Sequence, residues 1–295
     1  MAFSIYTVTE QEAALTVRDF LKAHHISARQ IQKLTRLKGI LLNGRPAYLK
    51  ASLRAGDVVK IRQTQPPQTN IQPEDLPVDI LYEDEFLFIL NKPPRQLVHP
   101  TGQTTSGTLA NALAHHLQKQ QQPIRFYPLH RLDRDTSGCV VFAKSPEAQR
   151  KLEKQRDTHI LTRTYQALVH GIPTKQEGTI RLPIGAHPTL ANRRTVRDDG
   201  DPAVTHYRAL TTYDKASLLE LTLETGRTHQ IRIHLAAIAL PILGDAMYGV
   251  RSVFIKRQAL HAAALSFRHL KTDQPITVHA PLPQDMVSAI SLCQN

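Results

Sequence analysis

Hydrophobic positions in the first 62 residues predict two short helices followed by a small sheet. Thr16 can cap the first helix, and Gly39 marks the end of the second. Strand-like runs cover 40–42 and 58–61, and the Asn43-Gly44 pair after the first run is a strong hairpin-turn signal. Apolar residues recur at the three- and four-residue spacing of a buried helix face: Val17, Phe20 and Leu21, then Ile31, Leu34 and Leu37.

The rest of the chain alternates between short strand-like runs and helical segments. Ser145 followed by a proline is a typical helix start. The segments do not follow a regular strand–helix–strand alternation, so they predict an α+β fold with a mixed, largely antiparallel sheet. The predicted strands are 78–82, 86–90, 139–143, 163–169 and 217–223, and the predicted helices are 108–118 and 146–155.

A segment rich in proline and glutamine separates the two regions. Residues 63–77 read QTQPPQTNIQPEDLP, with four prolines and four glutamines. Proline removes a backbone donor and disfavours helix before it, so the segment is predicted to be an extended linker. The expected organisation is a small α/β domain over 1–62, a linker over 63–77 and a larger α+β domain over 78–295.

Composition excludes several classes of protein. The chain has 295 residues, of which 41% are hydrophobic, which indicates a globular protein. Its two cysteines cannot form a disulfide framework, and no Cys/His spacing indicates a zinc site. No uncharged apolar stretch has membrane-spanning length, and the first ten residues do not resemble a secretory signal. We therefore expect a cytoplasmic monomer without a metal.

The positive charge is concentrated near the N-terminus. The net charge is +12, and residues 1–70 hold 11 Lys and Arg against 4 Asp and Glu. Arg29, Lys33 and Arg36 are spaced by four and three residues, so they share one helix face. Such a face either binds a polyanion such as RNA or is ordinary solvated surface.

The richest chemistry lies in HRLDRDTSG at 130–138. Two carboxylates, two arginines and a histidine in one short segment form either a surface ion-pair cluster or a catalytic centre. The sequence has no Gly-x-Ser-x-Gly elbow and no Gly-rich loop ending in Gly-Lys-Ser/Thr, so the common hydrolase and phosphate-loop motifs are absent.

Five motifs, in order, resemble those of the RluA-type pseudouridine synthases. Together they extend over about 78–285, and residues 14–62 resemble an S4-type RNA-binding domain. The motifs are LYEDEFLFILNKPPRQLVHPTG at 81–102, HRLDRDTSG at 130–138, TRTYQALVHG at 162–171, ETGRTHQIRIHLAAIALPILGDAMYG at 224–249 and RQALHAAALSF at 257–267.

This resemblance implies an RNA pseudouridine synthase of the corresponding fold. Uridine is released at nitrogen 1 and rejoined through carbon 5, which requires no cofactor. The implied essential carboxylate is Asp133, which either attacks the anomeric carbon or abstracts a proton to give a glycal. Arg232 is the cation that a buried carboxylate needs, and Tyr165 stacks on uracil and can take the carbon-5 proton.

The resemblance also implies RNA contacts. Arg131 fills the space that the flipped base leaves, and Arg227 is a candidate phosphate ligand. The expected partner is RNA, with ribosomal RNA favoured over transfer RNA. Two alternatives remain: a non-catalytic RNA-binding or ribosome-assembly protein, and a glycosidase that cleaves without rejoining.

Three residues depart from the family pattern. Arg95 stands where glycine is usual, Arg163 where lysine is common, and Asp201 where lysine is usual. Arg95 raises a question about the loop conformation, because glycine adopts positive φ easily and arginine does not.

Overall fold

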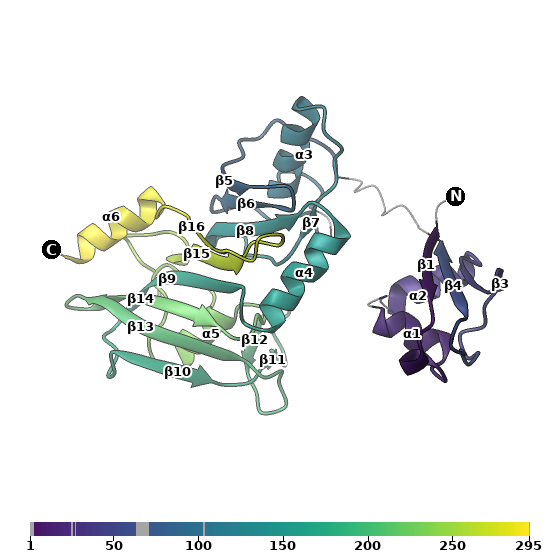
Figure 1. Ribbon diagram of the computed structural model, residues 1–295. Helices are drawn as coiled ribbons and strands as arrows, with labels where there is room; N and C mark the ends of the chain where they lie inside the picture. Colours follow the sequence, from purple (N-terminus) through teal and green to yellow (C-terminus); the bar gives the residue numbers. More distant parts are fainter. Residues whose placement is uncertain (1–2, 25, 27, 63–70, 103, 295) are drawn as a thin grey trace. The chain divides into compact units, whose positions relative to one another are not determined.

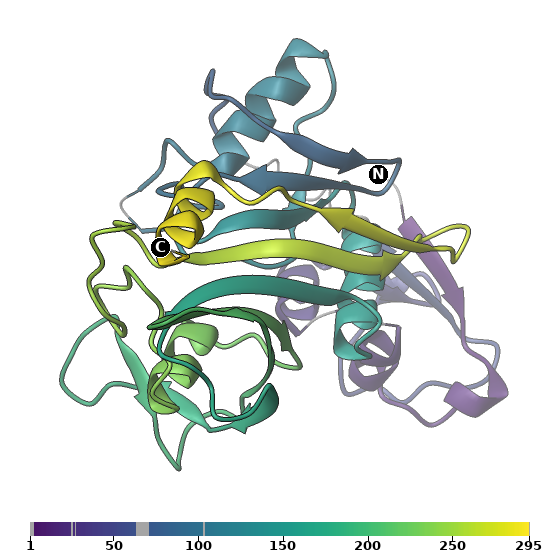
Figure 2. The ribbon, with the colours of Figure 1, turned by 90° about the vertical axis from the view of Figure 1, so that its left-hand side faces the viewer.

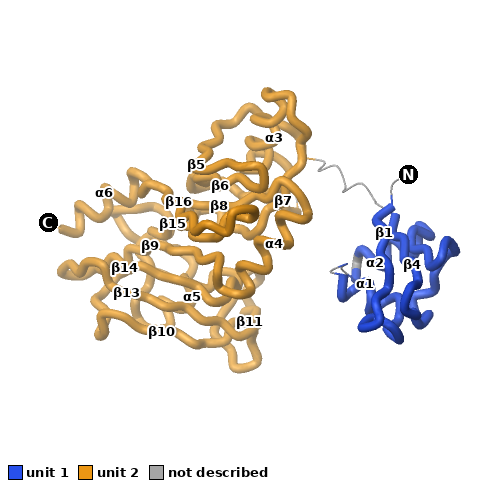
Figure 3. Tube along the Cα trace, viewed as in Figure 1, with its two compact units in different colours: residues 1–68 blue, residues 69–295 orange. Residues whose placement is uncertain are grey.

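The chain folds as two compact units, residues 1–68 and residues 69–295 (Figure 3). The structure is a computed structural model that describes residues 3–24, 26, 28–62, 71–102 and 104–294. Figure 1 shows a small unit of helices and strands and a larger unit built on one long sheet.

The N-terminal unit is an antiparallel sheet combined with two α-helices. The strand order is β1-β4-β2-β3, and the core residues Phe20, Leu21 and Val59 are fully buried. The strands are β1 (Phe3–Thr7), β2 (Ile40–Leu42), β3 (Arg45–Pro46) and β4 (Val58–Arg62), and the helices are η1 (Glu10–Glu12), α1 (Val17–Ala23) and α2 (Ala28–Arg36).

Local signals in this unit have the expected structural effect, with one exception. The Thr16 side chain accepts a hydrogen bond from the Asp19 N–H at the start of α1. Asn43 and Gly44 have φ values of 48° and 83°, as the turn of a hairpin with a type I′ connection requires. The prediction that Leu37 faces inward is wrong: α2 ends at Arg36, and Leu37 is 46% exposed.

Part of the predicted linker belongs to the second unit. Residues 63–70 lie outside the described residues, whereas residues 71–77 form neither helix nor strand and contact helix α3 (Leu109–Lys119). The Asn111 amide donates to the Gln72 carbonyl at 2.8 Å, and the Glu74 N–H donates to the Asn111 carbonyl at 3.1 Å. Two backbone groups of this proline-rich segment are therefore hydrogen-bonded to Asn111 of the neighbouring helix.

The second unit confirms the predicted α+β fold with a largely antiparallel sheet. The main path is β10-β13-β14-β9-β15-β8-β6-β5, with β16 beside β15 and β7 beside β8. Only β15 and β8 pair in parallel among the described strands. The strands are β5 (Ile80–Glu83), β6 (Leu87–Lys92), β7 (Tyr127–Pro128), β8 (Ser137–Ala143), β9 (Thr162–His170), β10 (Glu177–Arg181), β13 (Val204–Thr212), β14 (Ala216–Leu223), β15 (Leu260–Arg268) and β16 (Pro275–His279); β11 (Ile184–Ala186) and β12 (Arg194–Val196) form a separate hairpin.

Helices cover the sheet and begin at capping residues. Thr108 caps α3, and Ser145 caps α4 (Pro146–Asp157) with a proline in the first turn. The remaining helices are α5 (Gln230–Ala237) and α6 (Gln284–Cys293). Figure 2 shows β9 and β15 running side by side through the middle of this unit. No helix in the described ranges is both long and apolar enough to cross a membrane.

Gly138 lets the central strands approach each other. All seven residues of β8 are buried, and Gly138 pairs with Ala262 of β15. Its φ is 108°, and a Cβ here would overlap the backbone of Ala262. The start of β8, and with it the loop that precedes it, is therefore fixed against β15.

Candidate active site

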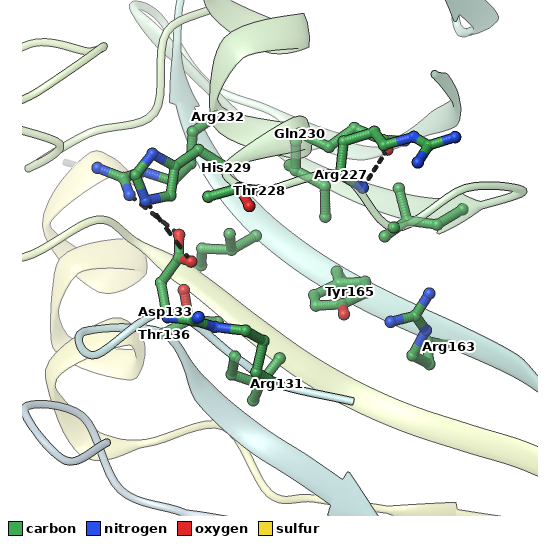
Figure 4. A pocket seen from close by; sticks show the side chains of 15 residues that line it. Arg131, Asp133, Thr136, Arg163, Tyr165, Arg227, Thr228, His229, Gln230 and Arg232 are labelled. Carbon is green, nitrogen blue, oxygen red and sulfur yellow. Dashed lines mark hydrogen bonds and ion pairs between the residues drawn. The ribbon is translucent and has the colours of Figure 1, made fainter. Parts of the chain in front are cut away.

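A pocket in the second unit gathers residues from four separate parts of the chain, the last of which is Leu260 of β15 (Figure 4). Residues 131–136 form the loop before β8, Arg163 and Tyr165 come from β9, and residues 226–232 lead into α5. In Figure 4, Asp133 points toward Arg232 and His229, and Tyr165 lies on the neighbouring strand. Four residues predicted from sequence for the uridine site, and the candidate phosphate ligand, are thus brought together: Asp133, Tyr165, Arg232, Arg131 and Arg227.

Asp133 is held by an arginine that is itself held by a second carboxylate. The Arg232 Nη1 donates to Asp133 Oδ2 at 3.0 Å. Its Nε and Nη2 donate to the two oxygens of Asp245 at 2.6 and 2.9 Å. Burial alone would lower the pKa of Arg232, but its two carboxylate partners outweigh burial and raise it. The guanidinium is therefore charged and fixed in orientation.

Asp245 is the buried anchor of this arrangement. Its side chain is 1% exposed, and besides Arg232 it accepts hydrogen bonds from the backbone N–H groups of Met247 and Tyr248. Burial raises the pKa of Asp245, yet the hydrogen bonds and charge of Arg232 lower it overall. Asp245 was not among the residues predicted from the sequence, although it lies within the motif at 224–249.

His229 provides a neutral neighbour for Asp133. Its Nε2 lies 3.8 Å from Asp133 Oδ1, and its Nδ1 is 2.9 Å from the Tyr248 hydroxyl. Burial lowers the pKa of His229 below its ordinary 6.5, although the Asp133 charge opposes the shift. The imidazole is therefore mostly uncharged near neutral pH, which leaves Arg232 as the nearest cation.

Two buried cations hold the loop directly after Asp133. The Lys92 Nζ, on a residue with no exposed surface, donates to the carbonyl of Arg134 at 2.9 Å and to the carbonyls of Pro93 and Gln96. The Arg257 Nη1 donates to the carbonyl of Asp135 at 3.0 Å. Burial lowers the pKa of Lys92 to about 7. Sequence reasoning singled out neither cation.

Tyr165 and Arg131 both line the pocket, but Tyr165 is buried and Arg131 is exposed to solvent. Tyr165 is 4% exposed, and burial raises the pKa of its hydroxyl, so it is protonated near neutral pH. Arg131 is exposed and makes no ion pair within the described part of the chain. Arg227 also lines the pocket, and its Nε donates to the Pro202 carbonyl at 3.1 Å.

The three departures from the family pattern have distinct structural settings. Arg95 adopts a φ of 65°, so the loop keeps the left-handed conformation that glycine would allow. Asp201 lies 3.8 Å from Arg227 and partly offsets its charge. Arg163 lines the pocket beside Tyr165.

The basic helix face of the N-terminal unit is only partly described. Lys33 and Arg36 on α2 are exposed, and the side chain of Arg29 lies outside the described residues. Arg36 also borders a groove with Arg18 and Lys22 of α1. Both α-helices of the unit thus contribute cations to one surface.

The chemistry available in the pocket is that of a carboxylate beside a fixed cation. Among the described residues, no group of three or more His, Cys, Asp or Glu side chains is placed to hold a metal ion. An aspartate beside a rigid guanidinium and a phenol can act as a nucleophile or as an acid–base group.

Comparison with known proteins identifies a consistent set of relatives. The sequence model of the family described as RNA pseudouridylate synthase matches residues 86–237. The chain is 39% identical to "Ribosomal large subunit pseudouridine synthase D" of Escherichia coli strain K12, over 86% of this chain and 82% of that protein. It is also 39% identical to "Uncharacterized RNA pseudouridine synthase YjbO" of Bacillus subtilis, over 94% of this chain and 98% of that protein.

Solved structures resemble the second unit in fold. The human structure named "RNA Pseudouridylate Synthase Domain Containing 1" matches with a TM-score of 0.59 and 25% identity, over 70% of this chain and 84% of that one. A second human structure, "RNA Pseudouridylate Synthase Domain Containing 4", matches with the same TM-score and identity, over 72% of this chain and 92% of that one.

Proposed function

The chain belongs to the RNA pseudouridylate synthase family, and from this premise we propose that it modifies ribosomal RNA with Asp133 as the reacting carboxylate. The enzyme is an isomerase that converts uridine in RNA to pseudouridine. The glycosidic bond to nitrogen 1 breaks and a bond to carbon 5 forms. No atoms are gained or lost.

The observation that carries the proposal is the Asp133–Arg232 pair in the wall of the pocket, at 3.0 Å. A carboxylate attacking the anomeric carbon must approach the sugar in one orientation, and a carboxylate abstracting a sugar proton has the same requirement. Arg232 supplies that orientation because Asp245 fixes its other two donors. Both routes use the same geometry.

Tyr165 and Arg131 complete the binding of a flipped uridine. Taking a base out of its stack costs a few kcal/mol, which protein contacts must offset. The ring of Tyr165 offers a stacking surface inside the pocket, and Arg131 is exposed at its edge, where a planar guanidinium can occupy the vacated stack. The phenol of Tyr165 lines the same pocket and is protonated, so it would take up the carbon-5 proton only while passing its own proton on.

We propose ribosomal RNA as the substrate because the relatives whose names state a target name the large ribosomal subunit. Several relatives at 38–39% identity carry the name "Ribosomal large subunit pseudouridine synthase D". The test is to incubate the protein separately with unmodified ribosomal RNA and transfer RNA and to map pseudouridine in each. Pseudouridine at defined ribosomal positions supports the proposal, and modification of transfer RNA alone would overturn it.

We also propose that the N-terminal unit binds RNA. Support comes from the exposed cations Lys33 and Arg36 on α2 and from the groove that Arg36 shares with Arg18 and Lys22. A surface of this kind gains affinity by releasing counterions from the phosphate backbone. The cations of this unit then hold RNA independently of the uridine-binding pocket.

A further inference from the structure

A second cavity borders the catalytic pocket on the side of helix α4. It shares four residues with the pocket, namely Arg131, Arg163, Gly226 and Arg227. Its other wall is formed by the end of α4 and the turn that follows, with Arg156, Asp157 and His159. None of these three α4-side residues has a part in the chemistry proposed above.

Arginine dominates the charge of this cavity. Four arginines line it: Arg131, Arg156, Arg163 and Arg227. Two carboxylates also line it, but each has a cation of its own. The Arg156 Nη2 lies 2.9 Å from Asp157 Oδ1, and Glu224 is 2.7 Å from His206 and 3.7 Å from Arg181.

Among the four arginines, Arg163 gives the strongest indication that the cavity binds an anion. It is half-buried, and within the described ranges no carboxylate forms an ion pair with it. Partial burial of a cation costs free energy when no carboxylate pairs with it, and binding an anion from outside the protein offsets that cost. Arg163 also lies against the backbone of Gly226, so its guanidinium is confined between the two cavities.

Two neighbouring features add no full charge to the cavity. Burial, and then the charges of Arg163 and Arg156, lower the pKa of His130 to about 3, so this lining histidine is neutral. The last carbonyls of α4 would be a source of negative potential, but they accept hydrogen bonds. Thr158 donates to the Lys154 carbonyl, and His159 donates to the Arg156 carbonyl.

We propose that this cavity binds a phosphodiester group of the RNA strand next to the uridine held in the catalytic pocket. Planar guanidinium groups match phosphate oxygens in pairs of hydrogen bonds. An RNA strand that places one nucleotide in the pocket must continue past the wall of the pocket. Arg163 and Arg227 form part of this wall, because they line both the pocket and the second cavity. The inference rests on the proposed function, because it assumes that RNA occupies the pocket.

Arg156→Gln is the decisive variant, because Arg156 lines the cavity and not the pocket. Arg150→Gln is the matched control, since it removes the same charge from an exposed position of the same helix. We expect R156Q to raise the Kd for RNA about five- to tenfold and to reduce the slope of log K against log salt by about 0.7. R150Q behaves like the wild type.

Two further variants separate phosphate binding from a structural role. Arg156→Lys keeps the charge and should retain the salt slope. Asp157→Asn removes a carboxylate from the cavity wall and should tighten RNA binding, whereas loss of a merely structural ion pair with Arg156 would not. The inference is overturned if R156Q and R150Q bind RNA alike, or if D157N leaves the Kd unchanged. A wild-type protein that binds RNA but forms no pseudouridine would instead count against the proposed function.

Discussion

Asp245→Asn tests whether Arg232 acts through its orientation. The carboxylate accepts three hydrogen bonds on Oδ1, from Arg232 Nη2 and from the Met247 and Tyr248 N–H groups. The amide oxygen of asparagine therefore occupies this position. Its NH2 group then faces the Arg232 Nε–H, which in the wild type donates to Oδ2 at 2.6 Å. The asparagine NH2 group and the Arg232 Nε–H are both donors, so the strong hydrogen bond between Arg232 Nε and residue 245 is lost.

The expected cost of this change follows from the burial of the pair. Arg232 is 6% and Asp245 1% exposed, and breaking a buried ion pair of this kind costs about 3 kcal/mol in the free energy of unfolding. If between half and nine-tenths of that loss also appears in the transition state, kcat falls about 10- to 100-fold. Arg232 keeps its hydrogen bond to Asp133, so RNA affinity should change little.

The assay is tritium release from carbon-5-tritiated RNA at saturating RNA, together with thermal unfolding. Asp285→Asn is the control, because Asp285 receives the same two donors from Arg257, at 2.7 and 2.9 Å, away from the pocket. It should lose stability but keep kcat within about threefold, since Arg257 retains its hydrogen bonds to backbone carbonyls. A folded D245N enzyme with wild-type kcat would refute the orienting role of Asp245.

Three other changes probe the supports of the site. Lys92→Met leaves three carbonyls without their donor and should lower the free energy of unfolding by about 3 kcal/mol in urea titrations; an unchanged value would mean that water replaces the ammonium. Gly138→Ala forces a positive φ and an overlap with the neighbouring strand, so we expect a loss of at least about 3 kcal/mol, and a melting temperature equal to that of the wild type would contradict the strand geometry. Changing Arg29, Lys33 and Arg36 together to Gln should weaken RNA binding and flatten its salt dependence, and an identical salt slope would exclude this helix face as a contact surface.

Local structure was the part of the fold that could be predicted from sequence. Capping by Thr16 and Ser145 and the turn at Asn43-Gly44 depend on residues a few positions apart, so their signals are complete within the sequence. The prediction for Leu37 is wrong because it used the same local information. The spacing of Leu37 fits the apolar face of the helix, but the helix ends one residue earlier.

Long-range geometry could not be read from local patterns. The placement of β15 between β9 and β8 depends on pairing between strands about 100 residues apart. Asp133 and Arg232, 99 positions apart, were matched only through the family resemblance. Asp245 went unnoticed because nothing in its neighbours indicates that it holds an arginine 13 positions away.

The most direct test of the central claim is tritium release by Asp133→Asn compared with the wild type. The substitution removes the charge of the carboxylate and keeps its shape. We predict that the wild type releases tritium without loss of base, and that the variant releases none above background while its Kd for RNA is unchanged. Turnover by the variant at a rate comparable to the wild type would contradict the assignment of Asp133 as the reacting group.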